Sequence, residues 1–137
     1  MKIYFSGSIR GGWEHQEIYH SIIGLLKKQG EVLTEFVGDS TLTYKGSSLP
    51  TSEIYKRDVG LIDMSDIVVA EVSTPSLGVG YEIAYAESKG IPIICLYKPE
   101  EGKSLSGMIE GNPNVRLFRY NNVSEAEEII NKNVNLA

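Results

Sequence analysis

Residues 3–12 read IYFSGSIRGG, a short apolar run that changes abruptly into a glycine-rich segment. The run Ile3-Tyr4-Phe5 has the β-branched and aromatic composition of a strand. Between Trp13 and Gln29, apolar residues then recur at helical spacing. This order predicts the first strand, loop and helix of an α/β fold, with the loop at the carboxyl end of the strand.

Apolar runs and helical patterns alternate along the rest of the chain. Four further strands are predicted at 31–37, 67–70, 91–97 and 115–120. Helices are predicted at 13–29, from 51 or 52 to about 62, at 78–88 and at 124–131, with a helical turn at 105–110. Continuously apolar strands that alternate with helices predict a flavodoxin-like α/β fold. Its sheet is doubly wound, mainly parallel and five-stranded, in the order 2-1-3-4-5 with helices on both faces.

Length and composition favour one domain, 1–137, with a surface loop at 38–50 and a frayed tail from about residue 131. The net charge of −5 argues against binding to nucleic acid, which favours a basic face. The single cysteine, Cys95, offers no disulfide and no zinc motif, and His15 and His20 do not share a helix face. We expect no metal, no cofactor, no membrane span and a cytoplasmic location.

Two glycine-containing segments carry candidate site residues. Segment 6–12 comprises backbone N–H groups and the Arg10 guanidinium that together suit a phosphate, although a plain tight turn explains it equally well. Segment 74–82 places two glycines and a serine before Glu82, at a helix start that faces the predicted cleft. A solvated glutamate that complements the helix dipole is the ordinary alternative for Glu82. Asp58 lies within the helix predicted from residue 51 or 52, and a position on the solvated face of that helix is its ordinary explanation.

Several collinear blocks resemble the 2′-deoxynucleoside 5′-phosphate N-hydrolases, relatives of the nucleoside 2-deoxyribosyltransferases. The blocks are KIYFSGSIRGG at 2–12, VLTE at 32–35, DIVVAEV at 66–72, PSLGVGYE at 75–82 and LSGMI at 105–109. Five blocks in one order are far more specific than any single glycine loop. The resemblance implies hydrolysis of a 2′-deoxynucleoside 5′-monophosphate to free base and 2-deoxyribose 5-phosphate, without a cofactor.

The resemblance also assigns residue roles. It implies that Glu82 attacks C1′ of the sugar and forms a covalent glycosyl-enzyme, that Tyr4 orients the Glu82 carboxylate, and that Asp58 binds the sugar or acts as acid/base. Phosphate binding is implied for Ile9, Arg10, Ser76, Gly78 and Ser106. Ser106 is expected to arrive from the second subunit of a homodimer. The surrounding loop residues Ser6, Gly7, Ser8, Gly11 and Gly80 are further candidates for substrate binding.

The chain departs from the family pattern at Phe36, where a histidine is expected, and at Trp13, where a basic residue is common. Base preference and the role of loop 38–52 therefore stay open. Three other functions also stay open. The chain could transfer deoxyribose between bases, hydrolyse ribonucleotides, or bind nucleotides without turning them over.

Overall fold

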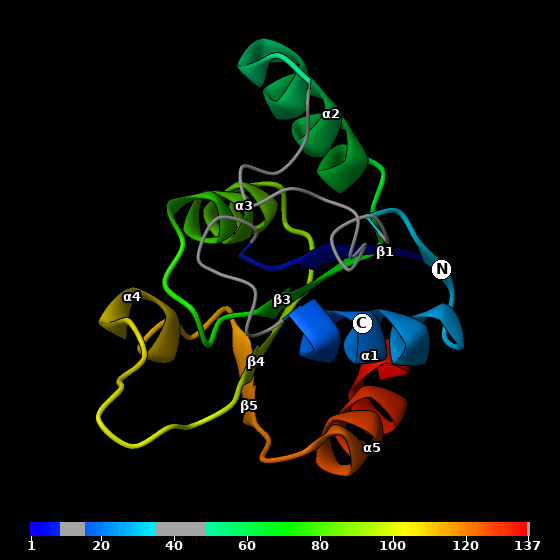
Figure 1. Cartoon of the computed structure of the whole chain (residues 1–137). Coiled ribbons are helices and arrows are strands. Elements are labelled where there is room, and N and C mark those ends of the chain that lie inside the picture. The colour runs from blue at the N-terminus through cyan, green and yellow to red at the C-terminus, as the bar shows by residue number, and fades with distance from the viewer. Residues whose placement is uncertain (9–15, 35–48, 137) are drawn as a thin grey trace.

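The computed structural model describes residues 1–8, 16–34 and 49–136. Helices and strands alternate along these residues (Figure 1). The strands are β1 (Lys2–Ser6), β2 (Glu31–Val32), β3 (Ile67–Glu71), β4 (Ile93–Tyr97) and β5 (Arg116–Arg119). The helices are α1 (Gln16–Lys27), α2 (Thr51–Asp63), α3 (Leu77–Ser88), α4 (Gly107–Glu110) and α5 (Val123–Asn133), followed by a 3-10 helix η2 (Val134–Leu136). The structure thus confirms the predicted alternation.

The strands form one parallel sheet in the order β2-β1-β3-β4-β5, which confirms the predicted flavodoxin-like topology. β3 and β4 are buried along their whole length, as expected for central strands covered on both faces. Helices α1 and α5 pack on one face of the sheet, α3 packs on the other, and α2 projects outward from α3 with its carboxyl-terminal end in the core beneath α3 (Figure 1). The carboxyl ends of β1 and β3 therefore meet at the point where the strand order reverses, which is where ligands bind in such sheets.

Strand β1 divides its side chains between the two faces. Ile3 and Phe5 join the core beneath α1 and α5, whereas Tyr4 packs in the core beneath α3. The strand pairs with β3 through Tyr4 opposite Val68 and Ser6 opposite Ala70. Since alternate residues of a strand share a face, Tyr4 and Ser6 both point towards α3.

The second strand is shorter than predicted. The strand expected at 31–37 is limited to Glu31–Val32, and residues 33–34 form a turn. The buried Thr34 hydroxyl accepts a hydrogen bond from Phe5 N at 2.7 Å and donates one to Phe5 O at 2.6 Å. A side chain thus satisfies backbone groups that a longer β2 would otherwise pair.

The carboxyl-terminal residues pack on the sheet. Where fraying was expected from about residue 131, α5 continues to Asn133 and the 3-10 helix follows. Val134 is fully buried in the core beneath α1 and α5, which explains why these residues are ordered into helix. Across the described residues, no helix has both the length and the apolar character required to cross a membrane.

Candidate active site

The Glu82 carboxylate is held at both oxygens by hydroxyl groups of β1. Tyr4 donates a hydrogen bond from its hydroxyl to Glu82 Oε2, and Ser6 Oγ donates one to Oε1 at 2.7 Å. Tyr4 is buried in the core, and Glu82 is partly buried. The structure therefore does not place Glu82 as a solvated helix-dipole residue. Its side chain is oriented at the carboxyl end of β1.

Burial is the main cause that raises the pKa of Glu82 above its ordinary value. The hydrogen bonds from Ser6 and Tyr4 act in the opposite direction, because they stabilise the charged form. Burial together with the Glu82 charge also raises the pKa of Tyr4, so this hydroxyl keeps its proton and remains a donor. The arrangement provides a poorly solvated carboxylate with fixed orientation, which is suited to nucleophilic attack.

Asp58 lies in α2. After burial, its negative charge is the second cause that raises the pKa of Glu82, and it also helps to raise the pKa of Tyr4. Arg57 Nε forms an ion pair with Asp58 Oδ1 at 2.9 Å, and the two side chains are 29% and 23% exposed. Asp58 is thus not a fully solvated helix-face residue. The positive charge of Arg57 lowers the pKa of Glu82, a contribution that sequence reasoning missed because no motif marks this arginine.

The amino-terminal end of α3 presents an open backbone beside the carboxylate. Ser76 caps the helix by accepting a hydrogen bond from Val79 N at 3.2 Å. A Cβ atom added at Gly78 would meet only Ser76 Oγ, at 3.9 Å, and one added at Gly80 would meet nothing within 4 Å. The protein's own packing does not require these glycines. They leave space for a ligand at a helix terminus that favours anions.

The start of the first glycine segment is packed tightly. A Cβ atom at Gly7 would lie 3.1 Å from ring atoms of Phe5 and Tyr19, so only glycine fits without displacing a ring. The buried Ser8 donates its backbone N–H to the Tyr19 hydroxyl at 3.1 Å. The remaining predicted residues of this segment, Ile9, Arg10 and Gly11, lie outside the described residues. So do Trp13 and Phe36, where the chain departs from the family pattern, and most of loop 38–52.

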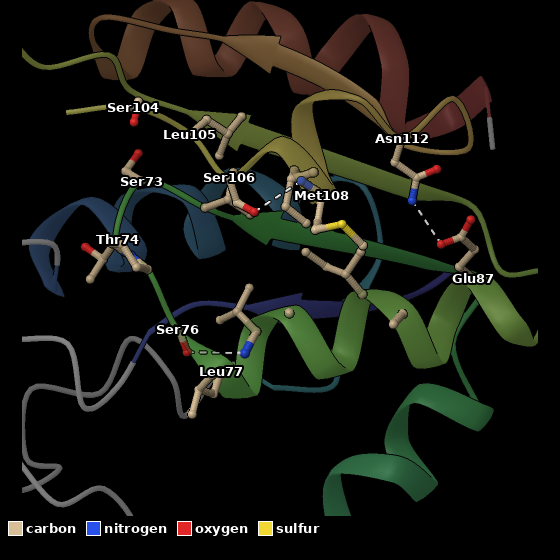
Figure 2. A pocket seen from close by; sticks show the side chains of 17 residues that line it. Ser73, Thr74, Ser76, Leu77, Glu87, Ser104, Leu105, Ser106, Met108 and Asn112 are labelled. Atoms are coloured by element: carbon tan, nitrogen blue, oxygen red, sulfur yellow. Dashed lines mark hydrogen bonds between the residues drawn. The ribbon is translucent and has the colours of Figure 1, made fainter.

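A cavity of about 500 Å³ lies between α3 and α4 (Figure 2). Ser76 and Ser106 both line it, and Ser106 accepts a hydrogen bond from Met108 N at 3.2 Å. Gly80 also lines the cavity, but residues two apart on a helix are separated by about 200°, so Glu82 points the other way. Within one chain, the structure thus brings Tyr4, Ser6 and Glu82 together, whereas Ser76 and Ser106 line the cavity between α3 and α4.

The Ser6 hydroxyl donates a hydrogen bond to Glu82, a contact that the sequence did not predict. Its place in the phosphate loop stays a prediction. The sequence does contain a sign of this contact: Tyr4 and Ser6 are two residues apart on a strand, so their side chains lie on the same face of the sheet. Among the described residues, no cluster of three or more His, Cys, Asp or Glu side chains could hold a metal ion.

Comparison with known proteins places this arrangement in a family. Residues 3–115 match the family described as nucleoside 2-deoxyribosyltransferase. The chain belongs to this family. A 5-hydroxymethyl-dUMP N-hydrolase of Mus musculus is 43% identical over 127 residues, which cover 91% of this chain and 73% of that protein. Its counterpart of the same name in Esox lucius is 45% identical over 130 residues, covering 93% and 90%.

Solved structures share this fold at low sequence identity. The structure of a CMP N-glycosidase of Clostridium botulinum, BcmB, superposes with a TM-score of 0.65 at 22% identity, covering 96% of this chain and 98% of that chain. A 2-desoxiribosyltransferase from Leishmania mexicana superposes with a TM-score of 0.54 at 15% identity, covering 96% and 97%. These likenesses extend along almost the whole chain and concern the fold alone.

Proposed function

We propose that the protein hydrolyses the N-glycosidic bond of 2′-deoxynucleoside 5′-monophosphates, giving free base and 2-deoxyribose 5-phosphate. The observation that carries the proposal is Glu82, a partly buried carboxylate whose two oxygens are held by Tyr4 and Ser6 beside an open helix terminus. The N-hydrolase names of relatives above 40% identity support the reaction and the substrate class. They also make 5-hydroxymethyl-dUMP the first substrate to test.

The reaction proceeds in two displacements. A Glu82 oxygen forms a bond to C1′ while the C1′–N bond breaks, and the base leaves with the bonding electron pair and takes up a proton. Water then attacks C1′ of the glycosyl ester, loses a proton, and releases Glu82 as a carboxylate. Asp58 supplies the proton that the leaving base takes up, and the resulting carboxylate accepts the proton that the attacking water loses.

Phosphate recognition falls to the amino-terminal end of α3 and to the first glycine segment. The Ser76 hydroxyl and the unobstructed backbone at Gly78 offer hydrogen bonds at a terminus whose dipole attracts anions. Ile9 and Arg10 complete this site in the proposal, with Arg10 able to bind two phosphate oxygens at once. A substrate without the 5′-phosphate is therefore bound more weakly.

We further propose that the active enzyme is a homodimer in which Ser106 reaches the phosphate of the neighbouring active site. Within a chain, Ser106 lines the cavity between α3 and α4, and Glu82 is not among the residues that line this cavity. Around the cavity between α3 and α4, the apolar side chains Leu77 and Met108 are 97% and 82% exposed, as expected of a surface that a second copy covers (Figure 2).

The test is base release from purine and pyrimidine deoxynucleoside monophosphates, including 5-hydroxymethyl-dUMP, alongside their dephosphorylated forms. Wild-type protein should release base from at least one monophosphate, and mass spectrometry of quenched reactions should detect 2-deoxyribose 5-phosphate attached to Glu82. The Glu82→Ala variant should lose both. Glu128→Ala removes an exposed glutamate of α5 and serves as the matched control. Absence of base release from every substrate defeats the proposal.

Transfer of deoxyribose to a second base is the alternative that the family description itself favours. It uses the same Glu82 ester, which a base rather than water would resolve. Supplying a deoxynucleoside with a second free base separates the two reactions. A transferase yields the new nucleoside irrespective of phosphate, whereas the proposed hydrolase yields only sugar phosphate and base.

A further inference from the structure

Glu71, the last residue of β3, carries a fully buried side chain that the proposed reaction does not use. Its Oε1 accepts the backbone N–H of Ser73 at 2.8 Å, and its Oε2 accepts the Ser73 hydroxyl at 2.8 Å and the Tyr120 hydroxyl. The Ser73 hydroxyl in turn accepts the backbone N–H of Lys98 at 2.8 Å. Glu71 thus accepts three hydrogen bonds, the pattern expected for a carboxylate.

This carboxylate is separate from the reacting one. Ile67 and Val69 face the core beneath α1 and α5, so alternation along β3 directs Glu71 to that same face. Tyr120, its hydrogen-bond partner, belongs to the same core. Glu82 is reached from Tyr4, on the other face of the sheet. Glu71 and Glu82 therefore do not form a catalytic carboxylate pair.

The network joins the carboxyl ends of three strands. Glu71 ends β3, Lys98 follows β4 directly, and Tyr120 follows β5 directly. Within residues 1–8, 16–34 and 49–136, no basic side chain forms an ion pair with Glu71. Burying a carboxylate is costly without such a pair, and an apolar side chain would fill the space at lower cost. What the carboxylate adds is a directional interaction with Ser73.

Ser73 begins the turn that leads to the helix cap. Residues 73–76 connect the buried end of β3 to α3, so fixing Ser73 limits where the Ser76 hydroxyl can lie. Tyr120 lies in the same core as Tyr19, whose hydroxyl accepts the backbone N–H of Ser8 in the first glycine segment.

We propose that Glu71 is a positioning residue for phosphate recognition. Through Ser73 it fixes the 73–76 turn and so holds the Ser76 hydroxyl where the 5′-phosphate of the substrate binds. The inference rests on the proposed function, because it assigns the Ser76 end of α3 to the phosphate. Glu71 itself touches neither the sugar nor the base, and its removal should weaken binding rather than the chemical step.

The experiment compares the variants Ser73→Ala, Tyr120→Phe and Glu71→Gln with two matched controls. Tyr85→Phe removes a tyrosine–carboxylate hydrogen bond to Asp63 of 2.7 Å, and Ser65→Ala removes a hydrogen bond of 2.7 Å from a hydroxyl to a backbone oxygen. The three network variants should raise KM for the monophosphate about tenfold and change kcat less than about twofold. The Kd for inorganic phosphate, followed by NMR titration, should rise in parallel. The controls should change neither quantity.

A double mutant of Ser73 and Ser76 distinguishes a positioning role of the network from a general loss of stability. In a Ser76→Ala background, adding Ser73→Ala should raise KM less than about twofold, because the group it positions is already gone. A full tenfold effect in that background overturns the inference, and so does an equal effect in the controls. If Glu71→Gln does not fold, Ser73→Ala and its double mutant decide the matter.

Failure of this inference differs from failure of the proposed function. Wild-type protein that binds inorganic phosphate but releases no base removes the proposed reaction, and the phosphate Kd of the variants then decides on Glu71. Wild-type protein that releases base while the variants keep its KM and phosphate Kd removes only the role of Glu71. Protein that neither releases base nor binds phosphate removes both.

Discussion

Replacing Tyr4 by phenylalanine removes one of the two hydrogen bonds to Glu82 with little other change. The ring keeps its place in the core beneath α3, so no cavity forms. Ser6 still donates to Oε1, but Oε2 no longer has its donor. Because the Tyr4 hydrogen bond lowers the pKa of Glu82 against the effect of burial, its removal should raise that pKa further.

The size of the effect follows from the charge on the acceptor of this hydrogen bond. A hydrogen bond to a charged group contributes about 1.5–3 kcal/mol, and one pKa unit corresponds to about 1.4 kcal/mol. The pKa of Glu82 in the free enzyme should therefore rise in Tyr4→Phe, since the charged form loses about 10- to 150-fold in relative stability. In the proposed mechanism Glu82 reacts as a carboxylate, so activity is lost as the pH falls through this pKa. The acidic limb of the profile should accordingly move to higher pH.

The assay is the pH dependence of kcat/KM for base release from the preferred monophosphate, since this ratio reports pKa values of the free enzyme. Tyr85→Phe, which removes an exposed hydrogen bond to Asp63 from the same helix, is the matched control and should keep the wild-type limb. Ser6→Ala removes the other donor to Glu82 and should move the limb in the same direction as Tyr4→Phe. An acidic limb that stays in place in both site variants, with activity measurable, refutes the assignment of Glu82 as the titrating nucleophile.

Three further predictions concern stability and reactivity. Because the pKa of Glu82 is raised in the folded protein, the stability that Glu82 contributes is present at low pH and is lost as the pH rises through that pKa. The free energy of unfolding of Glu82→Gln, measured by denaturant unfolding, should therefore exceed that of wild type by about 0.5–2 kcal/mol near neutral pH, and the difference should vanish in acid. Burial raises the pKa of Cys95 to about 12, so a thiol reagent at pH 8 should leave native protein unlabelled and label it only on unfolding. Gly80 lies inside α3 with open space around it, so Gly80→Ala should stabilise the monomer by about 0.5–1 kcal/mol in denaturant unfolding, and an unchanged or lowered midpoint would contradict this.

The fold could be predicted from the sequence because hydrophobic periodicity is a local signal. Continuous apolar runs identified β3 and β4, and the handedness of crossovers then limited the strand order. The length of β2 could not be predicted in this way. It depends on hydrogen bonds between the Thr34 hydroxyl and the backbone of Phe5, two residues far apart in sequence.

The candidate site could be predicted only in part. Resemblance and spacing pointed to Tyr4 and Glu82, which the structure brings into contact. The partners that set their electrostatics could not be predicted, because Ser6 and Arg57 act through the packing of β1 and α2 against α3. Nothing in the block at 66–72 distinguished Glu71, since a polar residue that ends a buried strand has no meaning until its donors are known.

Because side chains alternate between the two faces of β1, the register of its pairing with β3 decides which side chains face Glu82. Tyr4 and Ser6 face Glu82 only because Ile3 and Phe5 face the opposite core. Insertion or deletion of one residue in this strand would send both hydroxyls into an apolar interior and two large apolar side chains towards the substrate. Folding and reactivity would fail together, so an evolving lineage cannot alter substrate choice by lengthening β1.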